Sequence, residues 1–300
     1  MRKPLKRKLG KILSFAIAII AVAFYLTQNT DILKPAPETK IPEGSCAVHF
    51  IDVGQGDCTL ITSGGINVLI DAGENNKGDD VLIKLKELNI TSLDYVIGTH
   101  AHSDHIGGLD TVLNGIEVKN IILSDLPDKL VPTTKTYSDL LDAIVDNNVN
   151  LIAAEVGASY EIGEGSLTIL APVSDEYTDL NDWSIITKFV FGETSFLFTG
   201  DAEQRVEEDL LDLGIDVSAT LLKAGHHGSN TSSSVRFINT VNPDFAIIEV
   251  GEGNSYGHPH AETIKRFQNV GAEVYRTDIN GDITAVSDGK TITITCENEG

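Results

Sequence analysis

Short apolar runs alternate with polar turns and amphipathic stretches along most of this chain. Residues 46–53 (CAVHFIDV), 58–63 (CTLITS) and 67–70 (NVLI) are separated by GQGD and GG, which predicts strands joined by tight turns. Apolar residues then recur at helical spacing over residues 79–88. DYVIG at residues 94–98 has the composition of a buried strand that ends in a polar loop.

The alternation continues towards the C-terminus and predicts the fold class. We expect helices at about 136–147, 203–213, 233–240 and 261–269, strands near 151, 167, 186 and 196 and at 219–223 and 245–250, and a final hairpin around 288–290. Hairpin-connected strands open each half, and strand-helix alternation follows. This mixture predicts an α/β sandwich of two sheets with helices outside.

The N-terminal region has a different pattern. Residues 1–11 contain basic residues and no acidic ones, residues 12–26 (ILSFAIAIIAVAFYL) carry no charge, and residues 27–44 are proline-containing and aperiodic. A basic segment followed by an apolar one is typical of a membrane-directed sequence. The aperiodic segment reads as a linker to a domain over residues 45–300.

An anchor and a cleaved signal peptide are both compatible with this apolar segment. Its length is short for a spanning helix, and residues 21–23 offer an A-x-A-like cleavage site. Apolar residues follow that site directly, which favours an uncleaved single-pass transmembrane anchor. With the basic residues in the cytoplasm, the domain is expected outside the cell membrane, or secreted if the leader is cleaved.

Composition changes the picture in two ways. The 300 residues are 41% hydrophobic, enough for a sizeable core, and 22 Lys+Arg against 44 Asp+Glu give a net charge of −22. Such an acidic chain is not expected to coat nucleic acid, because phosphate binding needs a basic surface. The three cysteines, Cys46, Cys58 and Cys296, allow one disulfide or three buried thiols, and they are too few for a disulfide framework.

Histidines gather in loops that follow predicted strands, and the first cluster reads THAHSDHIGG over residues 99–108. Imidazole and carboxylate are ligands that zinc or manganese prefers. His100 and His102 alternate along an extended loop and can bind a first ion, which leaves Asp104 and His105 free to reach a second. His49 stands apart inside a strand, and we assign it no role.

Two later strand ends supply the remaining candidates. The strand SFLFT ends in Gly200-Asp201, which places a carboxylate where it could bridge two ions. ATLLKAGHHGS is a strand that leads into Lys223, His226 and His227, and one of the two histidines is expected to bind metal. Lys223 is either a base that makes the site positive for an anionic substrate or a solvated lysine at a strand end.

At this point the chain resembles a known family. HFIDVGQGDC, LIDAG, THAHSDHIGG, FLFTGD, LLKAGHHGS and NSYGHPH look like the ordered motifs of the metallo-β-lactamase fold, and are most similar to those of the hydrolase domain of the competence protein ComEC. The resemblance implies a four-layer αββα sandwich with two divalent metal ions at one edge of the sheets. It covers about residues 46–296.

The resemblance also implies roles for particular residues. His227 would be the last metal ligand and His226 a neighbour that faces substrate, although the two could exchange roles. Asp71 of LIDAG would orient a ligand histidine through its other ring nitrogen. His258 of YGHPH would face the substrate.

One departure from the family pattern concerns the first ion. Most members with two ions have another ligand histidine before the bridging aspartate, but no histidine occurs from residue 106 to residue 225. Either a water completes the first site, or a side chain near Asn181 and Asp182 substitutes.

These observations lead to a leading hypothesis and two alternatives. The leading one is a membrane-anchored, extracytoplasmic hydrolase that uses a hydroxide shared by two ions on an anionic phosphodiester, with DNA as one candidate substrate. The alternatives are an esterase of phosphorylcholine or another cell-envelope phosphoester, and a metal-stabilised surface binding module without turnover. Activity on β-lactams ranks below these, because the YGHPH and HHGS motifs are not those of that branch.

Overall fold

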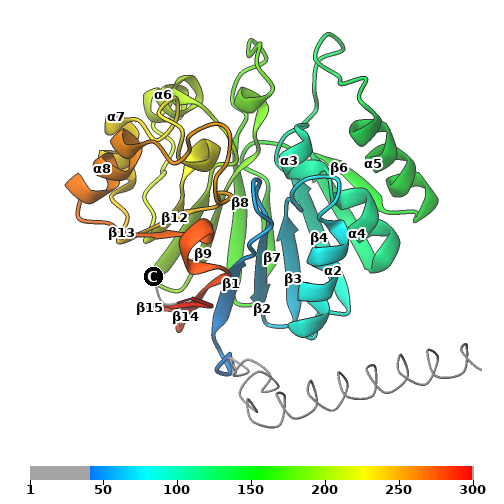
Figure 1. Cartoon of the computed structure of the whole chain (residues 1–300), viewed down its shortest axis with the longest axis horizontal. Helices are drawn as coiled ribbons and strands as arrows, with labels where there is room; N and C mark the ends of the chain where they lie inside the picture. The colour runs from blue at the N-terminus through cyan, green and yellow to red at the C-terminus, as the bar shows by residue number, and fades with distance from the viewer. Residues whose placement is uncertain (1–40, 299–300) are drawn as a thin grey trace, which may run out of the picture. The chain divides into compact units, whose positions relative to one another are not determined.

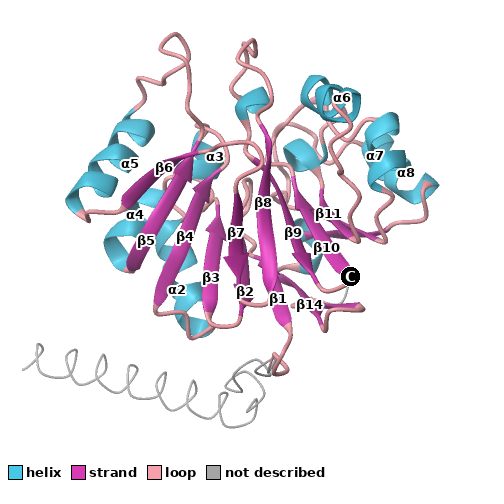
Figure 2. Cartoon of the chain, turned by 180° about the vertical axis from the view of Figure 1, so that it is seen from behind, coloured by secondary structure: helices cyan, strands magenta, loops and turns pink. Residues whose placement is uncertain are grey.

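Two sheets lie face to face between two layers of helices in the computed structural model, which describes residues 41–298 (Figure 1, Figure 2). The first sheet has eight strands in the order β15-β14-β1-β2-β3-β4-β5-β6: β1 (Cys46–Phe50), β2 (Thr59–Ser63), β3 (Ile66–Ile70), β4 (Ser92–Gly98), β5 (Glu117–Leu123), β6 (Asn150–Ala153), β14 (Ile283–Ser287) and β15 (Ile292–Cys296). The second has seven strands in the order β13-β12-β11-β10-β9-β8-β7: β7 (Ser159–Ile162), β8 (Gly165–Ala171), β9 (Ile186–Phe191), β10 (Thr194–Phe198), β11 (Leu221–Lys223), β12 (Phe245–Ile248) and β13 (Glu273–Arg276).

Helices cover the outer face of each sheet. They are α2 (Gly78–Glu87), α3 (Ser103–Ile106), α4 (Leu109–Gly115), α5 (Lys135–Asp146), α6 (Gln204–Asp212), α7 (Val235–Val241), α8 (Ala261–Asn269) and α9 (Thr277–Asn280), with the 3-10 turns η2 (Asn181–Trp183) and η3 (Gly225–Gly228). Side chains cap two of them: the Thr134 and Ser234 hydroxyls accept from the backbone N–H groups of Tyr137 and Phe237.

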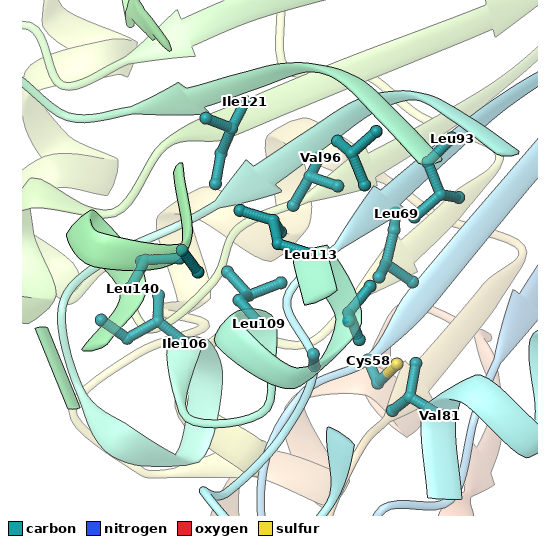
Figure 3. Close-up of a cluster of buried hydrophobic side chains, with 14 of the residues drawn as sticks. Cys58, Leu69, Val81, Leu93, Val96, Ile106, Leu109, Leu113, Ile121 and Leu140 are labelled. Atoms are coloured by element: carbon teal, nitrogen blue, oxygen red, sulfur yellow. The ribbon is translucent and has the colours of Figure 1, made fainter. Parts of the chain in front are cut away.

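Three apolar clusters hold the four layers together. One fills the space between the two sheets and includes Phe50, Phe189 and Phe198. A second packs α2, α4 and α5 on the first sheet, where Leu109 and Leu140 meet the strand residues (Figure 3). The third packs α6, α7 and α8 on the second sheet. Each fully buried large apolar side chain contributes about 1.5–3 kcal/mol, so the cores stabilise all four layers.

The predicted two-sheet sandwich with outer helices is confirmed, and the hairpin expected around residues 288–290 joins β14 and β15. Three strands were not anticipated from the sequence: β5, β7 and β13. β7 and β13 are the edge strands of the second sheet, and β5 begins with exposed and half-buried positions. Their polar positions face solvent, which weakens the apolar signal on which strand prediction depends.

The predicted cytoplasmic segment 1–11, the anchor or signal segment 12–26 and residues 27–40 of the linker lie outside the described residues. Within residues 41–298, none of the helices is long and apolar enough to cross a membrane. Cys46, Cys58 and Cys296 are all free thiols, and the first two are buried.

Strand direction explains why the predicted site residues can meet. In the first sheet β3 and β4 run parallel, and in the second β10, β11 and β12 run parallel. The carboxyl ends of parallel strands lie at one edge of a sheet, which is where ligands bind in such folds. The loops that carry the histidine clusters follow β4, β11 and β12, and Asp201 follows β10.

Candidate metal centre

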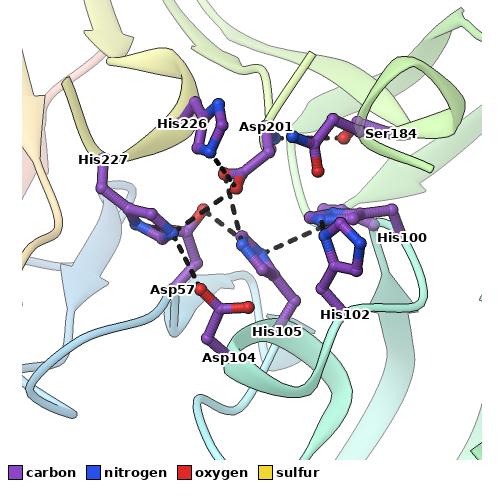
Figure 4. Close-up of polar contacts among 12 residues, drawn as sticks. Asp57, His100, His102, Asp104, His105, Ser184, Asp201, His226 and His227 are labelled. Atoms are coloured by element: carbon purple, nitrogen blue, oxygen red, sulfur yellow. Dashed lines mark hydrogen bonds and ion pairs between the residues drawn. The ribbon is translucent and has the colours of Figure 1, made fainter. Parts of the chain in front are cut away.

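Four buried side chains from separate strand ends converge on one point. Asp57, His105, Asp201 and His227 each offer a ligand atom, and these atoms lie within 4.8 Å of one another. His105 Nε2 is 3.2 Å from Asp201 Oδ1, and His227 Nε2 is 3.5 Å from Asp201 Oδ2. His227 Nε2 is also 3.3 Å from Asp104 Oδ2. The Nε2 atoms of both rings therefore face the Asp201 carboxylate, and that of His227 also faces Asp104 (Figure 4).

His100 and His102 lie beside this group. His100 Nε2 is 2.9 Å from His102 Nδ1, and the His100 ring lies 4.2 Å from the ring of His105 between centroids. Asp201 lies between this pair and His227 in the view of Figure 4. The structure thus brings the two predicted ligand sets together beside Asp201, whose bridging role stays a prediction.

The donor atoms fit divalent cations. His105 Nε2, His227 Nε2 and Asp201 Oδ1 are buried, and none of them has a hydrogen-bond partner among the described residues. Buried polar atoms are normally paired, so a cluster of such atoms on imidazoles and carboxylates is suited to an ion.

Electrostatics favour positive charge at this point. Burial alone would lower the pKa of His227, but the carboxylates of Asp201 and Asp57 raise it to about 10. Burial likewise opposes the charge of His105, whose pKa the same carboxylates and Asp71 raise well above its ordinary value. Burial would raise the pKa of Asp201, but His105 and His227 hold it well below its usual range. A cation would take the place of these protons.

A tight approach of backbone segments shapes the loop that carries the first histidine cluster. A Cβ added to Gly108 would lie 2.3 Å from the carbonyl oxygen of Ala72, and one added to Gly107 would lie 2.3 Å from the backbone nitrogen of Asn75. Glycine is therefore needed where the chain leaves the cluster and enters α4.

Asp71 lies behind His105. Its Oδ2 accepts from the Thr99 hydroxyl at 2.6 Å and is 2.8 Å from His105 Nδ1, and its Oδ1 accepts from the Thr99 backbone N–H at 2.8 Å. The side chain is 0% exposed, and burial raises its pKa. This geometry places the His105 proton on Nδ1 and leaves Nε2 free to bind an ion, which is the arrangement expected from the LIDAG motif.

The structure separates the two adjacent histidines of η3. His227 is buried, with Nδ1 2.9 Å from the Glu249 carbonyl oxygen, whereas the His226 side chain is 23% exposed and its Nε2 lies 3.6 Å from Asp201 Oδ2. Both residues have left-handed backbone angles, with φ near 50°. Non-glycine residues in this region are often held there at functional sites. His227 thus points to the interior of the site and His226 to its rim.

His258 lies at the same rim. Its ring centroid is 5.5 Å from that of His226 and 6.5 Å from that of His227. Burial and the neighbouring His226 lower its pKa to about 4, so it is neutral at pH 7. The exposed Tyr256 ring stacks on it, with 5.8 Å between centroids. Its predicted role in facing the substrate stays a prediction.

Lys223 is not the solvated strand-end lysine that was one of the two expectations from the sequence, since its side chain is 2% exposed. Its Nζ instead forms an ion pair with Asp57. The reason is that β11 lies inside the second sheet, between β10 and β12. The other expectation, a base that makes the site positive for an anionic substrate, stays a prediction.

Sequence analysis missed Asp57. The residue lies in the turn GQGD, and Gly-Asp after a strand reads as an ordinary turn. The sequence signal that could have found it is the pair of glycines on either side of Gln55, directly before a buried strand. A Cβ on Gly56 would lie 2.3 Å from the Asp104 carbonyl oxygen, so glycine lets this turn approach the histidine loop.

A water or a side chain near Asn181 and Asp182 was proposed to take the place of the absent family histidine. Asn181 and Asp182 lie in η2, and each has a buried Oδ1 without a hydrogen-bond partner among the described residues. Next to them the Ser184 hydroxyl accepts from the backbone N–H of Asp201 at 3.0 Å. Substitution by one of these side chains stays a prediction.

Comparisons with known proteins place the chain in a family. A family model described as the Metallo-beta-lactamase superfamily matches residues 51–251. The chain is 31% identical over 254 residues to ComE operon protein 3 of Bacillus subtilis, 28% identical over 243 residues to competence protein ComA of Neisseria gonorrhoeae, and 29% identical over 291 residues to recombination protein 2 of Haemophilus influenzae. The matches cover 79%, 80% and 94% of this chain, but only 32%, 32% and 33% of those proteins. The chain thus spans about a third of the length of these relatives.

Solved structures share the fold. The metallo-beta-lactamase fold protein YhfI from Bacillus subtilis aligns with a TM-score of 0.53 and 14% identity over 81% of this chain and 100% of its own. The metal-dependent hydrolase Tm1679 aligns with a TM-score of 0.50 and 16% identity over 77% of this chain and 95% of its own. Family match, fold and ligand cluster agree. The chain therefore belongs to the metallo-beta-lactamase superfamily, as a metal-dependent hydrolase related to proteins of the ComEC family.

Proposed function

We propose that this chain is a membrane-anchored, extracytoplasmic hydrolase of phosphodiesters, with DNA as the first substrate to test. The observation that carries the proposal is the convergence of the predicted ligands on Asp201. The Nε2 atoms of His105 and His227 lie 3.2 Å and 3.5 Å from its carboxylate oxygens, and the His100 ring lies 4.2 Å from the His105 ring between centroids. Zinc and manganese both suit this mixture of imidazole and carboxylate ligands.

Divalent ions held by these residues would supply positive charge for an anionic phosphate and lower the pKa of a water from 15.7 towards about 7. The chain's own groups perform the other tasks. Asp201 fixes the spacing of the two ligand sets, and Asp104 adds negative charge beside His227. His226 and His258 stand at the rim, where each can donate a hydrogen bond to a phosphate oxygen.

Two observations support a phosphodiester. Two relatives are named for competence or recombination, and a 42-residue segment is 48% identical to a protein named exodeoxyribonuclease YycJ of Bacillus anthracis. The net charge of −22 argues in the other direction for long DNA, because an acidic surface slows its approach. Short diesters are therefore expected to be better substrates than duplex DNA.

Purified residues 41–300, loaded with manganese or zinc, provide the test, since they form one compact unit. We expect hydrolysis of bis-p-nitrophenyl phosphate and of single-stranded oligonucleotides. Asp201→Asn should reduce turnover by at least about 100-fold, because the carboxylate shared by both ligand sets is lost. Asp216→Asn, which changes an exposed aspartate in the loop between α6 and β11, is the matched control.

The outcomes separate the competing functions. Cleavage of choline phosphoesters alone would favour the cell-envelope esterase, and metal-loaded protein that is inert on every diester would favour the binding module. Unchanged activity of Asp201→Asn would contradict the bridging role.

The membrane anchor has its own experiment. The full chain should sediment with membranes, and deletion of residues 1–26 should release it into the soluble fraction. Protease added to intact cells should digest residues 41–300 if the domain lies outside the cytoplasm.

A further inference from the structure

A buried ion pair joins the two sheets directly behind the metal centre. Asp57 follows β1 in the first sheet, and Lys223 ends β11 in the second, 166 residues further along the chain. The two side chains are 5% and 2% exposed, and their charged groups are in contact. Moving two charges out of water has a large cost, so a pair this deep needs a reason to be there.

Asp57 contacts three of the predicted ligands of the second ion. Its Oδ1 is 3.1 Å from His227 Nδ1, and its Oδ2 is 3.7 Å from His105 Nδ1. Its backbone N–H donates to the carbonyl oxygen of Asp104 at 3.1 Å. The carboxylate therefore lies on the Nδ1 edge of both rings, whereas their Nε2 atoms face Asp201 (Figure 4).

Lys223 reaches the remaining ligand. Its Nζ donates to the carbonyl oxygen of Gly200 at 3.2 Å, and Gly200 directly precedes Asp201. The same ammonium binds Asp57. The Lys223 side chain is therefore linked, directly or through Asp57, to the four predicted ligands of the second ion: Asp104, His105, Asp201 and His227. The ammonium faces Asp57 Oδ2, and Asp57 Oδ1 lies beside Nδ1 of His227, on the opposite edge of that ring from the Nε2 atom that faces Asp201.

We propose that Asp57 and Lys223 are positioning residues for the second ion. Asp71 and the Glu249 carbonyl bind the Nδ1 atoms of His105 and His227 directly, and the pair adds a second contact on the same edge of both imidazoles. It also holds the turn of Asp201 at the correct distance across the two sheets. His100 and His102, which would bind the first ion, make no contact with the pair among the described residues. The proposal rests on the two-ion site of the proposed function, but not on the identity of the substrate.

The experiment measures metal affinity instead of turnover. The full chain is stripped of metal and titrated with Zn²⁺ against a chromophoric chelator, which gives one dissociation constant for each ion. Lys223→Met and Asp57→Asn are each expected to weaken the second ion by about 10–100-fold, the usual effect of removing a partner behind a ligand, and to leave the first within about twofold. Lys188→Met is the matched control, because it removes a lysine of β9, in the same sheet, that pairs with Asp216 at 2.8 Å.

Two results would overturn the proposal. Folded variants whose two constants equal those of the parent chain would make the pair a structural contact only. Complete loss of the second ion in Asp57→Asn, with Lys223→Met unaffected, would make Asp57 a metal ligand. Failure of all metal binding in the parent chain would contradict the proposed function instead, which keeps the two failures distinct.

A single replacement leaves an unpaired buried charge and can prevent folding. The double variant Asp57→Asn/Lys223→Met removes both charges, keeps similar side-chain volumes and is measured in the same way. If that variant also fails to fold, NMR of the parent chain gives the answer. The pair predicts one lysine ammonium, bound to the Asp57 carboxylate, whose protons exchange slowly with water, and rapid exchange of every lysine ammonium would overturn it.

Discussion

Replacing Asp71 with asparagine tests how the centre controls its imidazoles. Asp71 is fully buried, and its carboxylate contacts His105 Nδ1 at 2.8 Å and the hydroxyl and backbone N–H of Thr99. Its backbone has φ of 60°, a left-handed angle that asparagine tolerates about as well as aspartate. The variant therefore changes hydrogen bonding with little disturbance of the backbone.

The expected effect comes from the direction of one proton. An amide oxygen can replace only one of the two carboxylate oxygens, so an NH₂ group now faces a donor, either His105 Nδ1–H or Thr99. When it faces His105, the imidazole must carry its proton on Nε2, the atom that faces Asp201 and would bind an ion. Metal must then displace that proton. Lost outer partners typically weaken metal binding by about 10–100-fold, equivalent to about 1.4–2.7 kcal/mol.

The assay is the same two-constant zinc titration, and only the second ion should be affected. Asp94→Asn is the control, because Asp94 is a buried carboxylate on β4 that accepts from the Asn67 backbone N–H at 2.9 Å, away from the histidines. Both variants should lose about 1.5–3 kcal/mol of stability. If folded Asp71→Asn binds the second ion within twofold of the parent chain, our reasoning on the His105 tautomer is refuted.

Three further predictions concern stability. Burial and the charge of Lys84 lower the pKa of His49 from 6.5 to about 4. Between pH 6.5 and pH 4 the folded state therefore binds fewer protons than the unfolded chain, and the folded state loses stability as the pH falls through this range. His49→Gln should remove up to about 3 kcal/mol of that pH dependence, which urea unfolding of metal-free protein at several pH values would measure; an unaltered pH profile would contradict the buried neutral histidine. Gly108→Ala should lower the unfolding free energy by about 1–3 kcal/mol, because its Cβ would lie 2.3 Å from the Ala72 carbonyl oxygen. Thermal unfolding followed by circular dichroism measures this, and an unchanged Tm would contradict it. Protein stripped of metal with a chelator should have an unfolding free energy about 4 kcal/mol lower than protein in a solution whose free metal concentration is 1,000 times the Kd. A Tm that does not change with metal concentration would exclude an ion bound only by the folded state.

Much of this protein was determined by local sequence. The alternation of apolar and polar positions predicted both sheets and most helices, because burial on one face requires a matching periodicity. The residue types at the strand ends, such as His100, His102 and Asp201, predicted a metal centre, because imidazoles and carboxylates in adjacent loops have few other uses together. The edge strands β7 and β13 were not predicted from the sequence, because their polar positions face solvent.

Only the tertiary structure decided which atoms face one another. It placed His227 inside and His226 at the rim, a distinction that two adjacent histidines cannot show by themselves. It also brought Asp57 to Lys223 across 166 residues and two sheets. Lys223 is therefore buried in an ion pair behind the candidate metal ligands and is not solvated at a strand end. The physical reason is that side-chain direction and burial depend on contacts between strands far apart in the chain, and no local pattern contains those contacts.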